Sequence, residues 1–438
     1  MPYYAHFIRT DRAEARVDRM TKESKLDQLI ASRRPGFTLP QAFYTDEDVF
    51  EADLERVYFP RWLLAGHTSQ VANPGDYFVF NLGRESLIVI RGDNGQLQAL
   101  FNTCRHRGSR ICLDSQGHVG KLVCPYHQWA YERDGRLAGA RSMGADFDKS
   151  RYPLHRAHVR VAEGLVYVCL ADSPPEFNEA HEVLSRFLRP HGLDRTKICF
   201  SQDYVVHANW KLLFENNREC YHCAVGHPEF CKTNYDLGMP GDQRTNAEYD
   251  AVMDRMRRHW ETNGLAVGPV NFPNGSWYRC ARVPLREGYV TESLDGQPLG
   301  PVMGDLKIRD AGSLRVITFP NAWCHVNSDN ANLTQLLPMG PRLTHARITW
   351  LVRDDAVEGE DYDPRRVIEL WKITTEQDWK LCESNQLGIN SSRYEPGPLS
   401  TVTEHGVDFF TSWYLVQLSA TNPALKAKLP DLSRTLTI

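Results

Sequence analysis

The sequence predicts an α+β protein with two domains, each built on an antiparallel β-sheet. The first observation is the region between Trp62 and Leu170, where short runs of β-forming residues alternate with Gly, Asn and Asp turn signals. The second is the later part of the chain, where longer strand-like runs are flanked by segments with helical periodicity. A chain of 438 residues is long enough for two hydrophobic cores. We therefore expect an antiparallel β domain and a larger domain whose antiparallel sheet is covered by helices.

The chain is expected to divide at residues 57/58 and 173/174. Residues 1–57 are expected to be a helical segment associated with the second domain, because Asp46 precedes apolar residues spaced as one helical face. Residues 58–173 hold the β-like runs, and the pair Asp134-Gly135 between two of them predicts a hairpin. In residues 174–438 we expect helices over 176–193, 211–221, 247–260 and 364–387, with strands near 201–210, 313–319, 322–328, 332–340 and 345–354.

Composition excludes several classes of function. A net charge of −4 without a long basic run argues against nucleic-acid binding. No apolar run approaches the 18 residues of a membrane span, and the N-terminus lacks the pattern of a secretory signal. The eleven cysteines are irregularly spaced and gather near histidines, which favours a reducing compartment and metal binding over a disulfide framework. We expect a cytoplasmic protein.

The most specific pattern lies in the predicted β domain. Cys104 and His106, then Cys124 and His127, form the spacing C-x-H-x17-C-x2-H. Two thiolates and two imidazoles could hold a structural zinc ion, which favours tetrahedral sulfur and nitrogen ligands. Each loop, however, supplies one cysteine and one histidine. This arrangement suits a [2Fe–2S] cluster in which one iron takes both cysteines and the other takes both histidines.

A second pattern, E-x2-H-x4-H, consists of Glu219, His222 and His227. Glu219 and His222 would share a face of a helix, whereas His227 lies about 140° further round, so a straight helix cannot aim both rings at one ion. We expect His222 in a helix and His227 where that helix ends. Two imidazoles with a distant carboxylate would form the facial triad of a non-haem Fe(II) site, and ordinary polar histidines are the alternative.

Together the two patterns resemble those of Rieske non-haem iron oxygenase large subunits. CRHRG and CPYHQW resemble the Rieske motif, and ENNRECYHCAVGHPE resembles the iron motif of this family. The resemblance covers most of the chain and implies that Cys104, His106, Cys124 and His127 bind the cluster, while His222 and His227 bind mononuclear Fe(II). Glu219 matches the acid that links a cluster in one subunit to the iron of its neighbour. Two departures are Gln128, where many members have glycine, and Glu219, where ring dioxygenases usually have aspartate.

The third iron ligand is predicted to be Asp378. It falls on the apolar stripe of the helix expected over 364–387, four residues after Thr374 and three before Leu381. A carboxylate on a buried face is costly, and metal coordination offsets that cost. The family's ligand also occupies a late helix of this kind. A buried salt bridge to an arginine is the alternative.

The resemblance also implies partners. No G-x-G-x-x-G motif is present, so a separate flavin or iron–sulfur reductase would supply electrons from NAD(P)H. The family solves the long distance between its two metal sites with a head-to-tail homotrimer, which is a closed heterologous assembly.

The substrate is predicted from the motif and from its glutamate. Both look most similar to quaternary-ammonium oxygenases that demethylate glycine betaine or stachydrine, and the reaction would release formaldehyde. Such a cation is held by aromatic faces. The candidates are Tyr235, Phe272, Trp277, Tyr278, Phe319 and Trp323, each of which could instead be core packing. The alternatives are a Rieske oxygenase for carnitine-like, choline-like or aromatic substrates, and a non-catalytic Rieske electron carrier.

Overall fold

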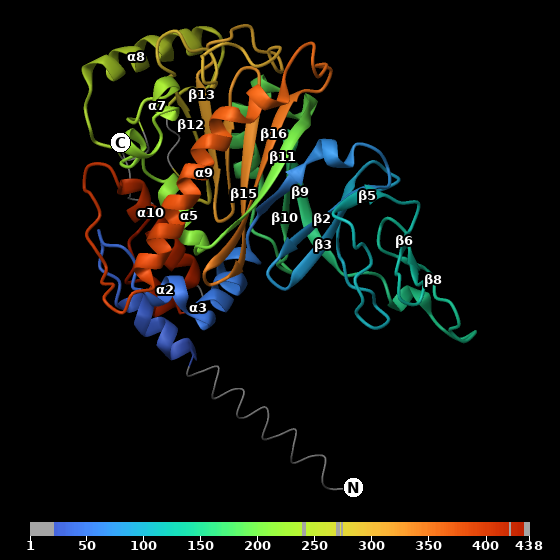
Figure 1. The fold of residues 1–438 in the computed structure, drawn as a ribbon. Helices are drawn as coiled ribbons and strands as arrows, with labels where there is room; N and C mark the ends of the chain where they lie inside the picture. The colour runs from blue at the N-terminus through green and yellow to red at the C-terminus, as the bar shows by residue number, and fades with distance from the viewer. Residues whose placement is uncertain (1–21, 239–241, 269–271, 273–274, 420–421, 433–438) are drawn as a thin grey trace.

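The computed structural model describes residues 22–238, 242–268, 272, 275–419 and 422–432. Two antiparallel sheets dominate the fold, one in each half of the chain (Figure 1). The smaller domain forms one end of the molecule, and helix α9 crosses the sheet of the larger domain (Figure 1). The predicted α+β class, with helices covering the second sheet, is confirmed.

The N-terminal segment is helical and packs on the larger domain. Residues 22–31 are helical and are followed by α2 (Ala42–Thr45), α3 (Glu47–Ala52) and the π-helix η1 (Asp53–Tyr58). Asp46 is the N-cap of α3, as predicted, and its side chain accepts hydrogen bonds from two backbone N–H groups. Asp53 is fully buried, pairs with Lys211 and accepts from the Tyr414 hydroxyl at 2.6 Å. This buried ion pair fixes the segment against the helices of the larger domain.

The smaller domain has a seven-stranded sheet and a three-stranded sheet. The first has the order β1-β10-β9-β4-β3-β2-β5, and the second has the order β6-β7-β8. Its strands are β1 (Leu63–His67), β2 (Asp76–Leu82), β3 (Glu85–Arg91), β4 (Leu97–Phe101), β5 (Gln116–His118), β6 (Leu122–Val123), β7 (Ala130–Tyr131), β8 (Leu137–Gly139), β9 (Arg156–Ala162) and β10 (Leu165–Cys169), with short helices η2 (Thr68–Val71) and η3 (Lys149–Arg151). The predicted hairpin at Asp134-Gly135 joins β7 to β8, where Gly135 has a positive φ of 86°.

The larger domain carries a six-stranded sheet of order β11-β16-β15-β14-β13-β12. Its strands are β11 (Thr196–Val206), β12 (Tyr278–Val283), β13 (Ser313–Thr318), β14 (Ala322–Val326), β15 (Ala331–Gly340) and β16 (Leu343–Arg353). Its helices are α4 (Asn178–Leu188), η4 (Arg189–His191), η5 (Leu193–Arg195), α5 (Trp210–Asn217), α6 (Cys223–Gly226), α7 (Phe230–Thr233), α8 (Ala247–Thr262), α9 (Pro364–Ile389), α10 (His405–Leu418) and α11 (Pro423–Lys426).

A few polar contacts join the two domains. The amide of Asn321 exchanges two hydrogen bonds with the backbone of Leu64, at 3.0 and 2.9 Å, and Gln335 donates to the same carbonyl at 2.8 Å. All three residues are buried. Two hydrophobic clusters likewise contain residues of both domains, and Leu64 belongs to one of them. Over the part of the chain that the structure describes, no helix is long and apolar enough to cross a membrane.

Candidate functional site

The loop after α5 carries the E-x2-H-x4-H pattern. Helix α5 ends at Asn217, so Glu219 lies in a loop and His222 is the N-cap of the short helix α6. The prediction that His222 lies within a helix is therefore wrong. The carboxylate of Glu219 accepts from the backbone N–H of Tyr221, a local contact that competes with helical hydrogen bonding.

A disulfide closes the same loop. Cys220 and Cys223 are joined, one on each side of His222, while the other nine cysteines have free thiols. The cysteine count did not predict this bridge. It ties the loop between α5 and α6, so it restricts the backbone on both sides of His222.

Three predicted ligands meet where this loop faces α9. Oδ1 of Asp378 lies 3.3 Å from Nε2 of His222 and 2.8 Å from Nε2 of His227. His227 follows one turn of α6, as its spacing predicted, and the change of direction there brings both rings to one point. The buried stripe of α9 continues through Cys382, whereas Leu381, which was predicted to lie on it, is exposed.

The outer nitrogens of both rings are also held. Nδ1 of His222 lies 2.6 Å from Glu219, and Nδ1 of His227 lies 2.9 Å from Gln377 Oε1. Because each Nδ1 donates outward, each Nε2 is left to face Asp378 as a ligand atom. Gln377 was not singled out by sequence, although its position next to Asp378 on α9 could have suggested it.

The charges at this point are strongly coupled. Burial alone lowers the pKa of His222, but hydrogen bonds to Asp378 and Glu219 outweigh it and raise the pKa to about 10. The pKa of His227 is also raised, because contact with Asp378 outweighs burial. Burial raises the pKa of Asp378, and its bonds to both histidines reverse this and lower it. The site therefore holds a carboxylate that requires positive charge beside it.

This donor set fits a divalent metal ion. Two imidazole Nε2 atoms and one carboxylate oxygen converge, and the contacts of Glu219 and Gln377 orient the rings as metal-binding histidines require. His222, Cys223 and His227 also present ligand atoms within 4.8 Å of one another. The Cys223 sulfur is in the disulfide, so nitrogen and oxygen ligands remain.

The second candidate site lies in the smaller domain. Cys104 and Cys124 are buried, and the rings of His106 and His127 are 4.6 Å apart at the surface. The ring of Trp129 stacks on His106 at 4.9 Å, and the Tyr131 hydroxyl lies 3.3 Å from the Cys104 sulfur. Two inner thiols and two outer imidazoles on adjacent loops match the ligand set of a [2Fe–2S] cluster with two ligands on each iron.

The backbone at Gln128, the residue after His127, adopts a conformation that glutamine rarely takes. Gln128 has a φ of 60°, a left-handed conformation in which most L-residues are strained. Its side chain accepts a hydrogen bond from Arg141 at 3.1 Å. The conformation is one that glycine adopts without strain, in line with the glycine expected at this position.

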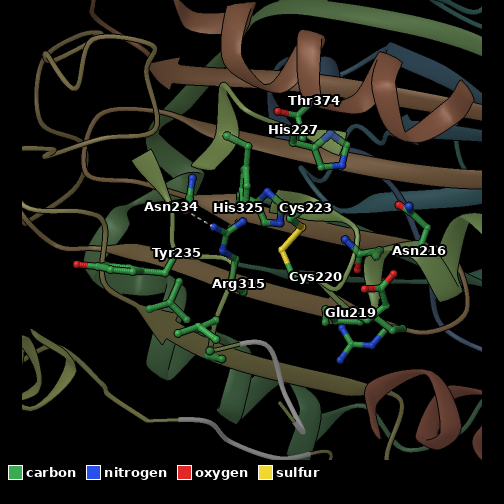
Figure 2. A pocket seen from close by; sticks show the side chains of 18 of the residues that line it. Asn216, Glu219, Cys220, Cys223, His227, Asn234, Tyr235, Arg315, His325 and Thr374 are labelled. Carbon is green, nitrogen blue, oxygen red and sulfur yellow. Dashed lines mark hydrogen bonds between the residues drawn. A yellow bond between two sulfur atoms is a disulfide. The ribbon is translucent and has the colours of Figure 1, made fainter. Parts of the chain in front are cut away.

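A cavity of about 90 Å³ lies beside the three ligands in the larger domain (Figure 2). Figure 2 shows His227 and Glu219 at two sides of it, with the Cys220–Cys223 disulfide between them and Tyr235 on the side away from Glu219.

Most of the predicted aromatic cage lies elsewhere. Of the six candidates only Tyr235 lines the cavity. Phe272 stacks on Phe319 at 4.5 Å, and Trp323 packs edge-to-face on Phe214 at 5.3 Å, so these are core contacts. Trp277 packs against both main clusters, and Tyr278 faces away from the cavity on β12. The aromatic side chains that do line the cavity are Phe230, Tyr235, Tyr249, His325 and Trp371.

Two models of known families match the chain. Residues 61–156 match the Rieske [2Fe-2S] domain. Residues 193–420 match the ring hydroxylating alpha subunit (catalytic domain). The first range contains all four cysteine and histidine positions described above, and the second contains Glu219, His222, His227 and Asp378.

Curated relatives named for glycine betaine match over nearly their full length. The chain is 41% identical over 403 residues to the glycine betaine monooxygenase oxygenase subunit of Chromohalobacter salexigens, covering 91% of this chain and 90% of the relative. It is 40% identical over 388 residues to the subunit of the same name in Pseudomonas aeruginosa, covering 88% and 90%. The carnitine monooxygenase oxygenase subunit of Escherichia coli is 32% identical over 212 residues, or 47% of this chain and 56% of the relative.

Solved structures share the fold. A quaternary ammonium Rieske monooxygenase superposes with a TM-score of 0.69 at 23% identity, covering 89% of this chain and 97% of that chain. Naphthalene 1,2-dioxygenase superposes with a TM-score of 0.67 at 18% identity, covering 92% and 98%. With both domains matched in sequence and in fold, the chain belongs to the family of Rieske-type ring-hydroxylating oxygenase alpha subunits.

Proposed function

We propose that this oxygenase hydroxylates an N-methyl group of glycine betaine, with stachydrine as a related substrate. The observation that carries this proposal is 40–41% identity, over about nine-tenths of the chain, to subunits named for glycine betaine. The lining of the cavity beside His222, His227 and Asp378 supports it, because aromatic faces such as those of Phe230 and Trp371 attract a quaternary ammonium group.

The proposed reaction uses one O2, two electrons and two protons. One oxygen atom enters a C–H bond of the N-methyl group and the other leaves as water. The resulting N-hydroxymethyl compound loses formaldehyde and a proton, and the nitrogen retains the electron pair of the broken C–N bond. The products are formaldehyde and the tertiary amine.

We assign the metal ligands as the geometry and the family suggest. Cys104, His106, Cys124 and His127 would hold the [2Fe–2S] cluster, and His222, His227 and Asp378 would hold the mononuclear iron. When bound, the cluster supplies single electrons and the iron supplies oxygen activation. The protein's own part is to orient the imidazoles through Glu219 and Gln377 and to place the substrate in the cavity.

A head-to-tail homotrimer is part of the proposal. Figure 1 shows β6 and β8, which flank the cysteine and histidine loops, at the end of the molecule away from α5 and α9. Both ends expose apolar side chains that an interface would cover: Leu113 and Tyr126 beside the first site, and Tyr221, Val225 and Leu387 beside the second. Glu219 and His222 also line a second, outward-facing hollow with Leu381 and Val407. A neighbour's His127 or His106 would dock there.

The remaining components follow from the family. A separate flavin or iron–sulfur reductase would deliver electrons from NAD(P)H, since this chain matches oxygenase subunits. We place the domain limits at residues 1–57, 58–173 and 174–438, and we expect the assembly to work in the cytoplasm.

Formaldehyde release tests this function. Purified protein, a generic reductase and NADH should yield one formaldehyde per glycine betaine consumed. The same preparation should contain about three irons and two acid-labile sulfides per chain. Zinc without sulfide would overturn the cluster, and turnover of an aromatic substrate without formaldehyde would overturn the betaine assignment.

A further inference from the structure

We infer that Arg279, together with Arg218, forms an anion subsite that binds the carboxylate of the substrate. This inference rests on the proposed function and deepens it, because it selects zwitterionic betaines over cations that lack a carboxylate. The two residues come from different elements. Arg218 caps the C-terminus of α5, and Arg279 lies on β12.

Both arginines line the cavity beside the proposed iron ligands. On β12, Arg279 alternates with Ala281 and Val283 on the face that forms the cavity wall. Arg218 immediately precedes Glu219, so it lies next to the residue that orients His222. A ligand in this cavity would therefore contact the arginines while its other end faces His227 and Asp378.

Both arginines are buried, and no carboxylate of the described chain pairs with either. Arg218 is 1% exposed and Arg279 is 3% exposed. Among the described residues, no hydrogen bond or ion pair reaches either side chain, and Nε of each is buried without a partner. Burial lowers the pKa of Arg279, and the nearby charge of Arg218 lowers it further. Two adjacent buried cations are costly to maintain unless an anion joins them.

Other buried cations of the described chain show the contrast. Lys211 pairs with the buried Asp53, and Arg315 pairs with Glu292 at 2.6 Å. Arg282, on the opposite face of β12, donates to the carbonyls of Ala311 and Ala266 at 2.6 and 3.1 Å. Each of these three structural cations therefore has a carboxylate or carbonyl acceptor within the fold. Within the described residues, the pair Arg218 and Arg279 has no such partner, so a ligand in the cavity would supply one.

A carboxylate fits the geometry of the side chains. A guanidinium presents parallel N–H donors that match two carboxylate oxygens, and such charge-assisted bonds are the strong ones. Glycine betaine carries its carboxylate one methylene from the quaternary nitrogen. Binding of the carboxylate at the arginines would thus leave the ammonium group for the aromatic side chains and the N-methyl groups for the iron ligands.

The test is calorimetric binding to the anaerobic, metal-loaded assembly. Four probes separate the two charges: glycine betaine, its carbon isostere 3,3-dimethylbutanoate, choline and tetramethylammonium. In the wild type, glycine betaine should bind more tightly than choline. In Arg279→Gln, the dissociation constants of both carboxylates should rise at least about tenfold, while that of tetramethylammonium stays unchanged. Arg279→Lys should recover part of the loss, because it restores charge without the planar fork.

Stability supplies an independent readout. Removal of an unpaired buried charge should leave the melting temperature of ligand-free Arg279→Gln unchanged or higher, whereas removal of a structural arginine lowers it. Arg365→Gln is the matched control, since it removes the same charge from a side chain that is 89% exposed. It should alter neither binding nor stability.

Two outcomes would overturn the subsite. One is that Arg279→Gln binds both carboxylates as tightly as the wild type does. The other is that the wild type binds glycine betaine and choline with equal affinity. The second measurement needs no variant and stands even if a substitution prevents folding. If the wild type binds both carboxylates through Arg279 but forms no formaldehyde, the subsite stands and the proposed function fails. If formaldehyde forms while Arg279→Gln binds normally, the function stands and the subsite fails.

Discussion

Oε1 of Glu219 lies 2.6 Å from Nδ1 of His222, while Nε2 of the same ring faces Asp378 at 3.3 Å. The imidazole of His222 thus links the Glu219 carboxylate, which lines the outer hollow, to Asp378, where the predicted iron ligands converge. Glu219 lines both the cavity and the outer hollow, which is the placement that the proposed coupling between subunits needs.

Replacing Glu219 with glutamine should preserve both metal sites and remove most turnover. The ligand atoms of both sites are intact in Glu219→Gln, but the charged acceptor that we propose to lie between subunits is lost. Reduction of the cluster by dithionite should stay normal, and single-turnover oxidation with substrate and O2 should fall at least about tenfold. Glu376→Gln, on the half-exposed face of α9, is the control and should behave as wild type. Unimpaired single turnover in Glu219→Gln would remove this residue from the electron route.

Replacing Asp378 with alanine should lower the occupancy of the mononuclear iron. The variant leaves two imidazoles without the carboxylate that now contacts both. Iron analysis should fall from about three to about two atoms per chain, with acid-labile sulfide unchanged. Glu369→Ala, an exposed acid on the same helix, should keep the full complement. Retention of the third iron in Asp378→Ala would show that another residue supplies the ligand.

Phe230 should contribute to binding of the ammonium group. Its ring lines the cavity 6.4 Å from that of His227 and is replaced in Phe230→Leu by a side chain without a π face. Affinity for tetramethylammonium should fall roughly five- to thirty-fold, since a desolvated aromatic face contributes about 1–2 kcal/mol. Affinity for 3,3-dimethylbutanoate should change little, because its tert-butyl group carries no charge for the ring to attract. Trp323→Leu is the contrast. The Trp323 ring packs in the core, so this variant should have a lower melting temperature but bind tetramethylammonium normally.

Stability should fall in mild acid partly because of His67. This ring is buried beside the Leu193 carbonyl, at 2.8 Å, and burial lowers its pKa to about 4, although that hydrogen bond and Asp194 oppose the shift. An unfolded histidine titrates near 6.5, so between pH 6.5 and 4 the unfolded chain binds more protons than the folded one. Lowering the pH through this window should cost up to about 3 kcal/mol.

The comparison of variants isolates this effect from other titrating groups. Between pH 7.5 and 5, the melting temperature of His67→Gln should drop less than that of wild type. His155→Gln, at an exposed position, should drop as much as wild type. Equal acid sensitivity in all three proteins would show that His67 is not responsible.

The sequence alone determined the fold class and the members of the site that lie close together in the chain. Strand-like runs and the hairpin at Asp134-Gly135 depend on local propensity and turn chemistry, and the structure contains them. The pairs Cys104/His106 and Cys124/His127, and the spacing of His222 and His227, depend on short-range geometry in the same way. Asp378 could be found because one polar residue on a buried helical face is visible in a periodic pattern.

Only the tertiary structure decided which distant side chains share the cavity. Burial is a property of packing, so Phe319 and Trp323 look like cage residues in sequence but lie in the core, while Phe230 and Trp371 line the cavity. Gln377 becomes a partner of His227 only because α9 lies against α7. Arg279 reads as an ordinary strand residue. Its meaning arises because β12 places it at the cavity, where no carboxylate of the described chain pairs with it.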